Sequence, residues 1–367
     1  MYNEKALSMK APYTITGQAQ TRFHGINIKR LLTDALLWIA VAVFNVLGSA
    51  NVNDLRQYPS ISLRYETPFT GQAAYQARQY SIEHADEDSF WLTYWRQAKA
   101  SFEGEYNTAS ATCIYFSGDA SLVWPARYMS GGSPGVTDGS GCSVSSALAA
   151  SLWGGTDVAG KSIEVGGETR TVRGVFEEEE LLALVSVRDE DKTQSFTCVE
   201  LSGGPDSPSR SDAESFVKSA GLGSPDSVLM GTFTSLATGL SALPLVILGF
   251  YALALCLVYL KSFPIALRGG LFLALIALAF LLPGILDTLP SWMIPTRWSD
   301  FSFWSGLFDQ ISGNLREYLL LTPKLRDVAY KTLLLKQILL AFPAVGCALS
   351  ICFRWHGKRK LILSPYK

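Results

Sequence analysis

Four stretches of the chain contain no charged residue over lengths that match the thickness of a membrane. Residues 35–53, 227–260, 269–286 and 337–353 hold no Asp, Glu, Lys or Arg over 19, 34, 18 and 17 positions. A helix needs about 20 apolar residues to cross the hydrocarbon core, and lipid offers its backbone amides no partner outside the segment. We therefore expect four transmembrane helices, which we place at 31–50, 228–260, 269–289 and 333–353.

The region between the first two helices has the hydrophobic pattern of a folded domain. Apolar positions alternate with polar ones in some segments, which predicts strands, and recur at helical spacing in others. The aromatic residues from Phe90 to Phe102 fall at helical spacing, so we predict a helix there that faces the core. The expected strands are 61–65, 111–116, 161–165, 169–176, 181–187 and 195–201, the expected helices are 71–83, 86–102, 143–153 and 209–219, and 130–141 is expected to be a loop. Interleaved strands and helices indicate an α+β domain over 51–227.

The distribution of charge orients these segments. The N-terminal segment 1–30, the loop 261–268 and the basic tail 354–367 together carry 12 basic and 1 acidic residue, whereas 51–227 carries 13 basic and 25 acidic residues. Short Lys/Arg-rich segments stay in the cytoplasm. We therefore expect a multi-pass protein of the bacterial cytoplasmic (inner) membrane with both termini inside, and with the α+β domain and the loop 290–332 outside. Alternatively, the first helix is a signal peptide cleaved near residues 48–50.

Three short motifs resemble functional sites but occur in the wrong context. Residues 155–162, GTDVAGKS, fit the phosphate-loop pattern, yet a helix precedes them and a hairpin follows, which reverses the required order. The LSGG sequence at 201–204 and the acidic strand at 184–189 stand in the wrong order for an ABC ATPase. The acidic run 177–180 is typical of a solvated turn. We expect no catalytic, cofactor-binding or metal-ligating residue, and the pairing of Cys113, Cys142 and Cys198 stays open.

Residues 143–176 resemble the extracytoplasmic core domain of MacB-like ABC transporter permeases, in which a short helix runs through a glycine-lysine turn into a hairpin. The matching turn residues are Gly154, Asp157, Gly160, Lys161 and Gly174, and we interpret them as structural. The order of one span, an outer domain and three further spans is similar as well. Departures are Trp153, Val158 and the long outer loop 290–332. The resemblance implies a non-enzymatic permease subunit without its own nucleotide-binding domain, which uses ATP only through a separate cytoplasmic ABC ATPase.

The resemblance also implies a mechanism, in which the ATPase moves the outer domain to export a hydrophobic or peptidic substrate. Its contact would be the loop 261–268, through Lys261, Phe263, Pro264 and Arg268. The second hydrophobic stretch would extend to about 51 Å as a helix and so serve as a stalk. An alternative is an FtsX-like membrane regulator or sensor that acts on a cell-envelope partner without transport.

The second span carries small residues at four-residue spacing, which permits close approach of helices. These residues are Gly231, Ser235 and Gly239. They indicate packing either within the chain or in a homodimer or pseudo-dimer with a second permease. We expect membrane lipid as a further partner and no nucleic acid.

Overall fold

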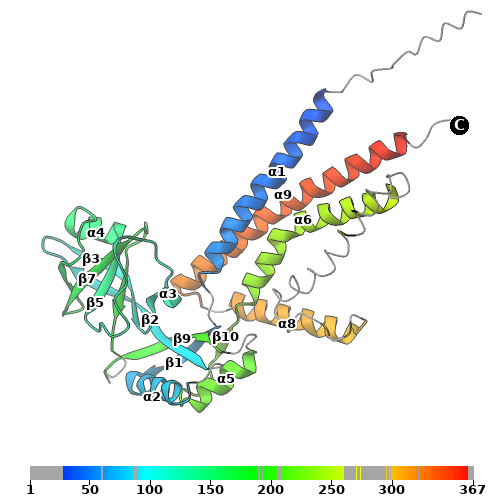
Figure 1. Ribbon diagram of the computed structural model, residues 1–367. Helices are drawn as coiled ribbons and strands as arrows, with labels where there is room; N and C mark the ends of the chain where they lie inside the picture. The colour runs from blue at the N-terminus through cyan, green and yellow to red at the C-terminus, as the bar shows by residue number, and fades with distance from the viewer. Residues whose placement is uncertain are drawn as a thin grey trace, which may run out of the picture.

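The computed structural model describes residues 28–58, 61–85, 89–188, 191, 193–204, 209–259, 270, 273, 295, 297, 299–320 and 322–362. Three long helices run side by side and meet an α+β domain at one end (Figure 1). They are α1 (Ile28–Leu55), α6 (Thr232–Tyr259) and α9 (Leu325–Ile362). The helix α1 begins and α9 ends at the end of this bundle that is farthest from the sheet (Figure 1).

Each long helix contains a segment that is long and apolar enough to cross a membrane. These segments are Leu31–Leu55, Phe233–Leu257 and Leu325–His356. The expected span at 269–289 lies outside the described residues, apart from Gly270 and Leu273. The structure therefore supports three of the four expected spans.

The domain is built on one mixed sheet of ten strands, which confirms the α+β class. The order is β10-β1-β9-β2-β3-β8-β5-β7-β4, and β6 pairs with β2 and β7. The pairs β3–β8 and β5–β7 are parallel, and the other pairs are antiparallel. The strands are β1 (Ile61–Thr70), β2 (Phe90–Glu103), β3 (Thr108–Ser117), β4 (Tyr128–Gly131), β5 (Gly141–Ser145), β6 (Ser162–Val165), β7 (Glu168–Phe176), β8 (Leu182–Ser186), β9 (Ser195–Gly203) and β10 (Ser227–Leu229).

Short helices cover the sheet at its two ends. They are α2 (Gly71–Glu83), α3 (Ala120–Val123), α4 (Ser146–Trp153) and α5 (Arg210–Ser219), and α8 (Phe301–Leu320) projects sideways near β10 (Figure 1). The Ser209 side chain accepts from the Asp212 amide while the Asp212 carboxylate accepts from the Ser209 amide, a capping box that begins α5. The expected helices at 71–83 and 209–219 are confirmed.

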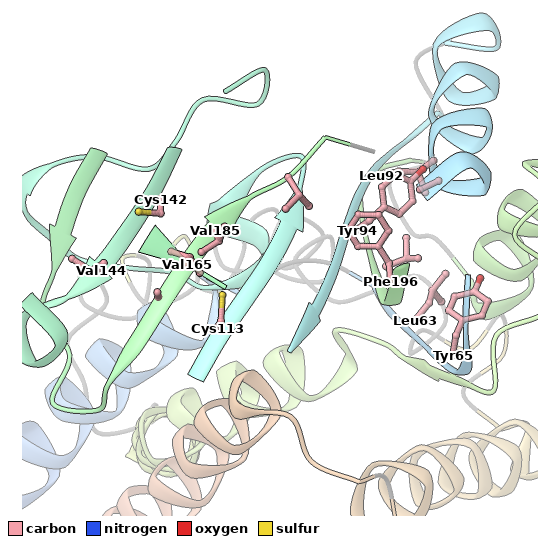
Figure 2. Close-up of a cluster of buried hydrophobic side chains, with 14 of the residues drawn as sticks. Leu63, Tyr65, Leu92, Tyr94, Cys113, Cys142, Val144, Val165, Val185 and Phe196 are labelled. Atoms are coloured by element: carbon pink, nitrogen blue, oxygen red, sulfur yellow. The ribbon is translucent and has the colours of Figure 1, made fainter. Parts of the chain in front are cut away.

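The buried core extends through both ends of the domain, and β2 connects them. Figure 2 shows Leu63, Tyr94 and Phe196 together near α2, while Cys113 and Val185 lie together farther along the sheet. All of these side chains belong to one cluster of buried residues. The two ends of the sheet are therefore one packed body rather than two independent domains.

The helix expected at 86–102 is wrong, because residues 90–103 form the strand β2. Phe90, Leu92 and Tyr94 point into one core, whereas Trp95 points into a second core on the opposite face. Aromatic residues favour strands, and pairing with β9 on one side and β3 on the other fixes the extended form. The spacing of the aromatic residues fits both the helical period and the two-residue period of a strand, and the pairing with β9 and β3 decides in favour of the strand.

Two other boundaries differ from expectation. The loop expected at 130–141 contributes its first residues to β4 and its last to β5, and the helix that follows begins at Ser146. Ser227–Leu229 pair with β1 as β10, so the second long helix begins only at Thr232. The helix α9 instead begins at Leu325, within the expected outer loop, and reaches the sheet.

Candidate coupling site between the sheet and the membrane helices

Four charged side chains are buried together where the sheet meets α9. Arg64 comes from β1 and Glu200 from β9, whereas Arg326 and Asp327 lie in the first turn of α9. Their residues are between 0% and 5% exposed. We call these four residues the coupling cluster. It joins the α+β domain to a helix that is long enough to span a membrane.

The ion pairs of the coupling cluster form a continuous chain of alternating charge. Arg64 Nη2 lies 2.7 Å from Asp327 Oδ1, and Arg64 Nη1 lies 3.3 Å from Glu200 Oε1. Arg326 Nη2 lies 3.1 Å from Glu200 Oε2. Two cations and two anions balance, so the cluster places no net charge in the interior. Burial of charge is tolerated in proteins when the charges are paired and hydrogen-bonded in this way.

Neutral groups of the domain fix the Glu200 carboxylate in place. Trp95 Nε1 donates to Glu200 Oε1 at 2.9 Å, and the Ser62 hydroxyl donates to the same oxygen. The Arg64 guanidinium stacks over the Trp95 ring, 4.9 Å from its centroid. Burial lowers the pKa of Arg64, but neighbouring acidic groups, Asp327 and Glu200 among them, raise it by more, so the net pKa is above its usual value. Arg64 therefore stays charged.

The α9 end of the cluster is a helix start that is bonded to the sheet. Asp327 Oδ2 accepts from the Lys324 amide at 3.1 Å, which caps the first turn of α9. Arg326 Nε donates to the Leu122 carbonyl at 3.2 Å, and the Leu325 amide donates to Gln97 Oε1 at 2.8 Å. The start of α9 is thus bonded to β2 and to α3, in addition to its ion pairs with β1 and β9.

Aromatic side chains connect the coupling cluster to α1, α6 and α8. Tyr58, which follows α1, lies 5.6 Å from the Tyr330 ring of α9 and under the Arg326 guanidinium. Tyr318 of α8 lies 5.7 Å from the Phe233 ring of α6, and its hydroxyl donates to the Asp327 carbonyl at 3.3 Å. Burial raises the pKa of Tyr58 to about 12. Every long helix therefore has an aromatic contact at the point where it meets the domain.

Polar contacts also join the three long helices to one another. Asn51 of α1 donates to the Leu333 carbonyl and to Gln337 Oε1 of α9, at 2.9 and 3.1 Å. Asn45 of α1 donates to the Ser241 carbonyl of α6 at 3.0 Å. Side-chain hydrogen bonds of this kind stabilise helix pairs in lipid. Displacement of α9 would therefore act on α1 and α6 as well as on the sheet.

A pocket of about 530 Å³ opens beside the coupling cluster, between the base of the sheet and the helices α1 and α9. Its walls combine apolar and acidic side chains. They include Asp54, Trp124, Glu177, Glu178, Glu180, Leu325, Val328 and Leu333. Most of the acidic run that the sequence predicts as a solvated turn thus lines a pocket at the level of the membrane helices.

The turn that carries the sequence resemblance is formed by glycines in special conformations. Gly154 ends α4 with φ +74° and Gly160 has φ +89°, both in the left-handed region that glycine adopts without strain. A Cβ at Gly174 would lie 2.5 Å from backbone atoms of Gly132. Asp157 is exposed. Lys161 is also exposed, and its Nζ lies 6.0 Å from the centroid of the Trp153 ring.

The elements around this turn stand in a different order from those of a phosphate loop. The helix α4 precedes residues 155–162, and the hairpin β6–β7 follows them, as the sequence predicts. A phosphate loop needs a helix N-terminus after the glycines. Residues 201–203 of the LSGG sequence complete β9. Among the described residues, no group of three or more His, Cys, Asp or Glu side chains converges as a metal site.

The structure places the expected helix-packing residues at different depths. Gly231 precedes α6 and Ser235 is half-buried, whereas Gly239 is exposed and a Cβ there would meet nothing within 4 Å. A role for Gly239 in packing against another chain stays a prediction. The expected ATPase-contact residues, Lys261, Phe263, Pro264 and Arg268, lie outside the described residues.

The three cysteines of the domain are all buried and free. Cys113 and Cys142 lie on β3 and β5, on either side of β8, and Cys198 lies on β9. Burial raises the pKa of the Cys113 and Cys142 thiols to about 12. They therefore act as small apolar core groups.

The coupling cluster is not among the features that the sequence predicts. Arg64 stands between Leu63 and Tyr65, and Glu200 stands between Val199 and Leu201. This alternation is equally typical of a strand with one solvated face, so it does not mark either charge as buried. Arg326 and Asp327 sit just before an apolar stretch and were assigned to an outer loop. Nothing local links the three segments, since Arg64 and Asp327 are 263 residues apart.

No protein-family model and no curated protein matches the chain. Among solved structures, the chain is similar to the extracellular domain of the noncanonic ABC-type transporter YknZ from Gram-positive bacteria, at 15% identity and a TM-score of 0.33, over 43% of this chain and 87% of that one. It is also similar to the periplasmic region of MacB from Actinobacillus actinomycetemcomitans, at 10% identity and a TM-score of 0.40, over 50% of this chain and 94% of that one. MacB, whose permease family the sequence resembles, is thus one of these two.

Proposed function

We propose that this chain is the membrane subunit of a MacB-like ABC transporter, without its own nucleotide-binding domain. A separate cytoplasmic ATPase moves the long helices, and those helices move the α+β domain to expel a hydrophobic or peptidic substrate. The observation that carries this proposal is the coupling cluster, which ties the sheet to α9 through paired buried charges. The glycine turn and the placement of the domain between α1 and α6 also support it.

The connections suit the transmission of a movement, because they are short in sequence or are bonded to several elements of the domain. The chain passes from α1 to β1 and from β10 to α6 within a few residues, and α9 is bonded to four elements of the domain. Motion travels through such packed networks when they have two discrete arrangements. The pocket beside the cluster, with its apolar and acidic walls, is where we place the substrate.

The proposal requires the chain to cross the membrane once more between α6 and α8, and the described helices do not include this crossing. The helix α6 leads away from the sheet, whereas α8 ends beside the coupling cluster at Tyr318. We propose that the span expected at 269–289 makes this return. The loop 261–268 then faces the ATPase, and Lys261, Phe263, Pro264 and Arg268 are the proposed contacts.

The proposal is tested by purification of the tagged chain from its native membranes, followed by measurement of ATP hydrolysis in proteoliposomes. We expect an ABC ATPase to copurify and to hydrolyse ATP. We expect Lys261→Ala with Arg268→Ala to release the ATPase while the chain itself stays folded. The matched control is Lys324→Ala, a basic residue at the sheet end of the bundle, which should retain the ATPase. Recovery of the folded chain without any ATPase would overturn the proposal.

Transport and regulation are separated by a second measurement on the same material. A transporter moves an amphiphilic peptide across or out of the proteoliposome membrane when ATP is added. If the chain is instead a regulator that acts on a cell-envelope partner, the copurified ATPase hydrolyses ATP and the peptide does not move. ATP-dependent movement that stops with Asp327→Asn, while the ATPase stays bound, would support coupling through the cluster.

A further inference from the structure

The helix α8 carries an apolar stripe that the rest of the described chain leaves uncovered. Phe301 is 85% exposed and Phe308 is 71% exposed. The side chains of the stripe recur at intervals of three, four or seven residues, which places them on one face of a helix. The stripe consists of Phe301, Trp304, Phe308, Leu315 and Leu319.

The opposite face of α8 is polar, and the helix has a defined beginning. Ser302, Asp309 and Gln310 lie on that side of the helix. Asp300 accepts from the amides of Ser302 and Phe303, at 3.0 and 3.3 Å, so it caps the first turn. The helix α8 is therefore a complete amphipathic helix in its own right and needs a partner for its apolar face.

Only the C-terminal end of α8 is anchored in the described structure. Tyr318 is 4% exposed and contacts Phe233 and Tyr330, whereas the remainder of the helix projects away from the bundle (Figure 1). Phe233 is the first residue of the apolar span Phe233–Leu257. The anchored end of α8 consequently lies beside the start of this apolar segment of α6.

We propose that α8 lies in the membrane surface, with its apolar stripe in the lipid of the leaflet next to the α+β domain. Large aromatic and aliphatic side chains on one face and charged or polar ones on the other are the pattern of helices that lie in this interface. The anchored end of α8 contacts the start of the apolar segment of α6, which favours lipid as the occupant of the stripe. A second copy of the chain or another protein is the competing occupant.

The charges of α8 determine which lipids it requires. Residues 300–320 contain Asp300, Asp309 and Glu317 but only one cation, Arg316. No basic patch is present in this segment to attract anionic headgroups. Burial of apolar surface therefore holds the helix at the membrane, and zwitterionic lipid without net charge is sufficient for its binding.

The placement gives the coupling cluster a reference point in the membrane surface. Tyr318 donates to the Asp327 carbonyl at 3.3 Å, so the end of α8 is bonded directly to the start of α9. The helix α8 holds that point at the lipid surface, while α9 continues into the bilayer. This inference stands apart from the transport proposal, since it needs no ATPase and no substrate.

The test uses the full chain in phosphatidylcholine liposomes, with a spin label at Phe308→Cys or, as the matched neighbour, at Asp309→Cys. Collisions of the label with oxygen, which enriches in lipid, and with a water-soluble nickel chelate are measured by electron paramagnetic resonance. We expect the label at 308 to collide with oxygen and not with nickel, and the label at 309 to show the reverse preference. Unsubstituted chain gives the background from its own cysteines.

Three other outcomes would overturn the proposal. Frequent nickel collisions at both positions would place the stripe in water. Few collisions of either kind at 308 would place it against protein. A requirement for anionic lipid would contradict insertion by apolar burial alone. The second pair, Leu315→Cys and Arg316→Cys, repeats the comparison if a label at 308 prevents folding, and both pairs are exposed positions.

Discussion

Arg64 on β1 and Asp327 on α9 are 263 residues apart in the sequence, and their charged groups meet at 2.7 Å in a fully buried setting. This pair is the most direct link between the sheet and a helix that is apolar enough to span a membrane. It is also a vulnerable link, because removal of one partner leaves the other as a buried, partly compensated charge.

The first prediction concerns this pair. Asp327→Asn keeps the size of the side chain but removes the charge that balances Arg64. We expect a loss of about 3–5 kcal/mol in the free energy of unfolding, the usual cost of breaking a buried ion pair. Tryptophan fluorescence during denaturant unfolding of the detergent-solubilised chain measures this loss.

The matched control is the exposed pair of Arg127 and Glu177. Arg127 Nη1 lies 3.8 Å from Glu177 Oε2, and the two side chains are 81% and 66% exposed. Exposed pairs contribute about 0–1 kcal/mol, so Arg127→Ala should change little. Replacement of both cluster partners, Arg64→Met with Asp327→Leu, should recover part of the loss. Equal effects of Asp327→Asn and Arg127→Ala would contradict the structural role of the cluster.

Local signals in the sequence were sufficient for much of the fold. The hairpin at Gly166 and Gly167, whose φ values are +58° and +89°, follows from two adjacent glycines between alternating segments. The apolar lengths located three of the long helices. The error at β2 arose because Phe90, Tyr94 and Trp95 satisfy a helical spacing, and only pairing with β9 and β3 makes the strand the better solution.

The candidate site could not be predicted because its parts meet only through the tertiary fold. Glu200 gains its partners from β1, β2 and α9. Arg326 and Asp327 lie in a segment of mixed charge between two apolar stretches, so the sequence predicts an outer loop there. Arg64 alternates with Leu63 and Tyr65 as a solvated residue of a strand would, so the sequence indicates neither its burial nor its partners.

The second prediction tests the glycine turn. Gly160 has φ +89°, where a side chain costs about 1–2 kcal/mol, so Gly160→Ala should lower the free energy of unfolding of the domain by that amount. Gly155 is the matched control, because it lies outside the positive-φ set and has open space around it. Gly155→Ala should leave stability unchanged.

A further variant of the same turn, Lys161→Ala, tests the nucleotide question. A fluorescent ATP analogue should show no saturable binding to the purified chain, and Lys161→Ala should not alter that result. Saturable binding that Lys161→Ala abolishes would restore the phosphate-loop interpretation.

The third prediction concerns pH and the loop between β4 and β5. The hydrogen bond from Arg173 Nε, at 2.7 Å, lowers the pKa of Asp138 below its ordinary value of 3.8. A lowered folded pKa means that the carboxylate stabilises the fold fully above the unfolded value and loses this effect as pH falls through the folded value. Protection of residues 132–141 from hydrogen exchange should therefore decrease below about pH 4.

The control for this prediction is Asp138→Asn, measured by mass spectrometry with correction for the intrinsic effect of pH on exchange. The amide side chain cannot titrate, so protection in the variant should be lower at neutral pH and should not change with acid. An acid response of the same size in both proteins would assign the effect to other groups.

The fourth prediction separates packing within the chain from packing between chains. A Cβ at Gly48 of α1 would lie 3.3 Å from Ser241 Oγ and 3.4 Å from Gln337 Nε2, so α1 passes close to both α6 and α9 there. Gly48→Leu should push these helices apart and lower the melting temperature of the solubilised chain. Gly239 has nothing within 4 Å of its Cβ position, so Gly239→Leu should leave the folded chain intact.

The oligomeric state of the two variants then decides the role of the small-residue spacing on α6. If Gly239 lies in a seam between two chains, Gly239→Leu converts a dimer into a folded monomer, which size-exclusion chromatography with light scattering detects. Gly48→Leu should instead destabilise the chain in either state, because its contacts are internal. A dimer that survives Gly239→Leu would remove this face of α6 from the interface and leave the exposed glycine as ordinary lipid-facing surface.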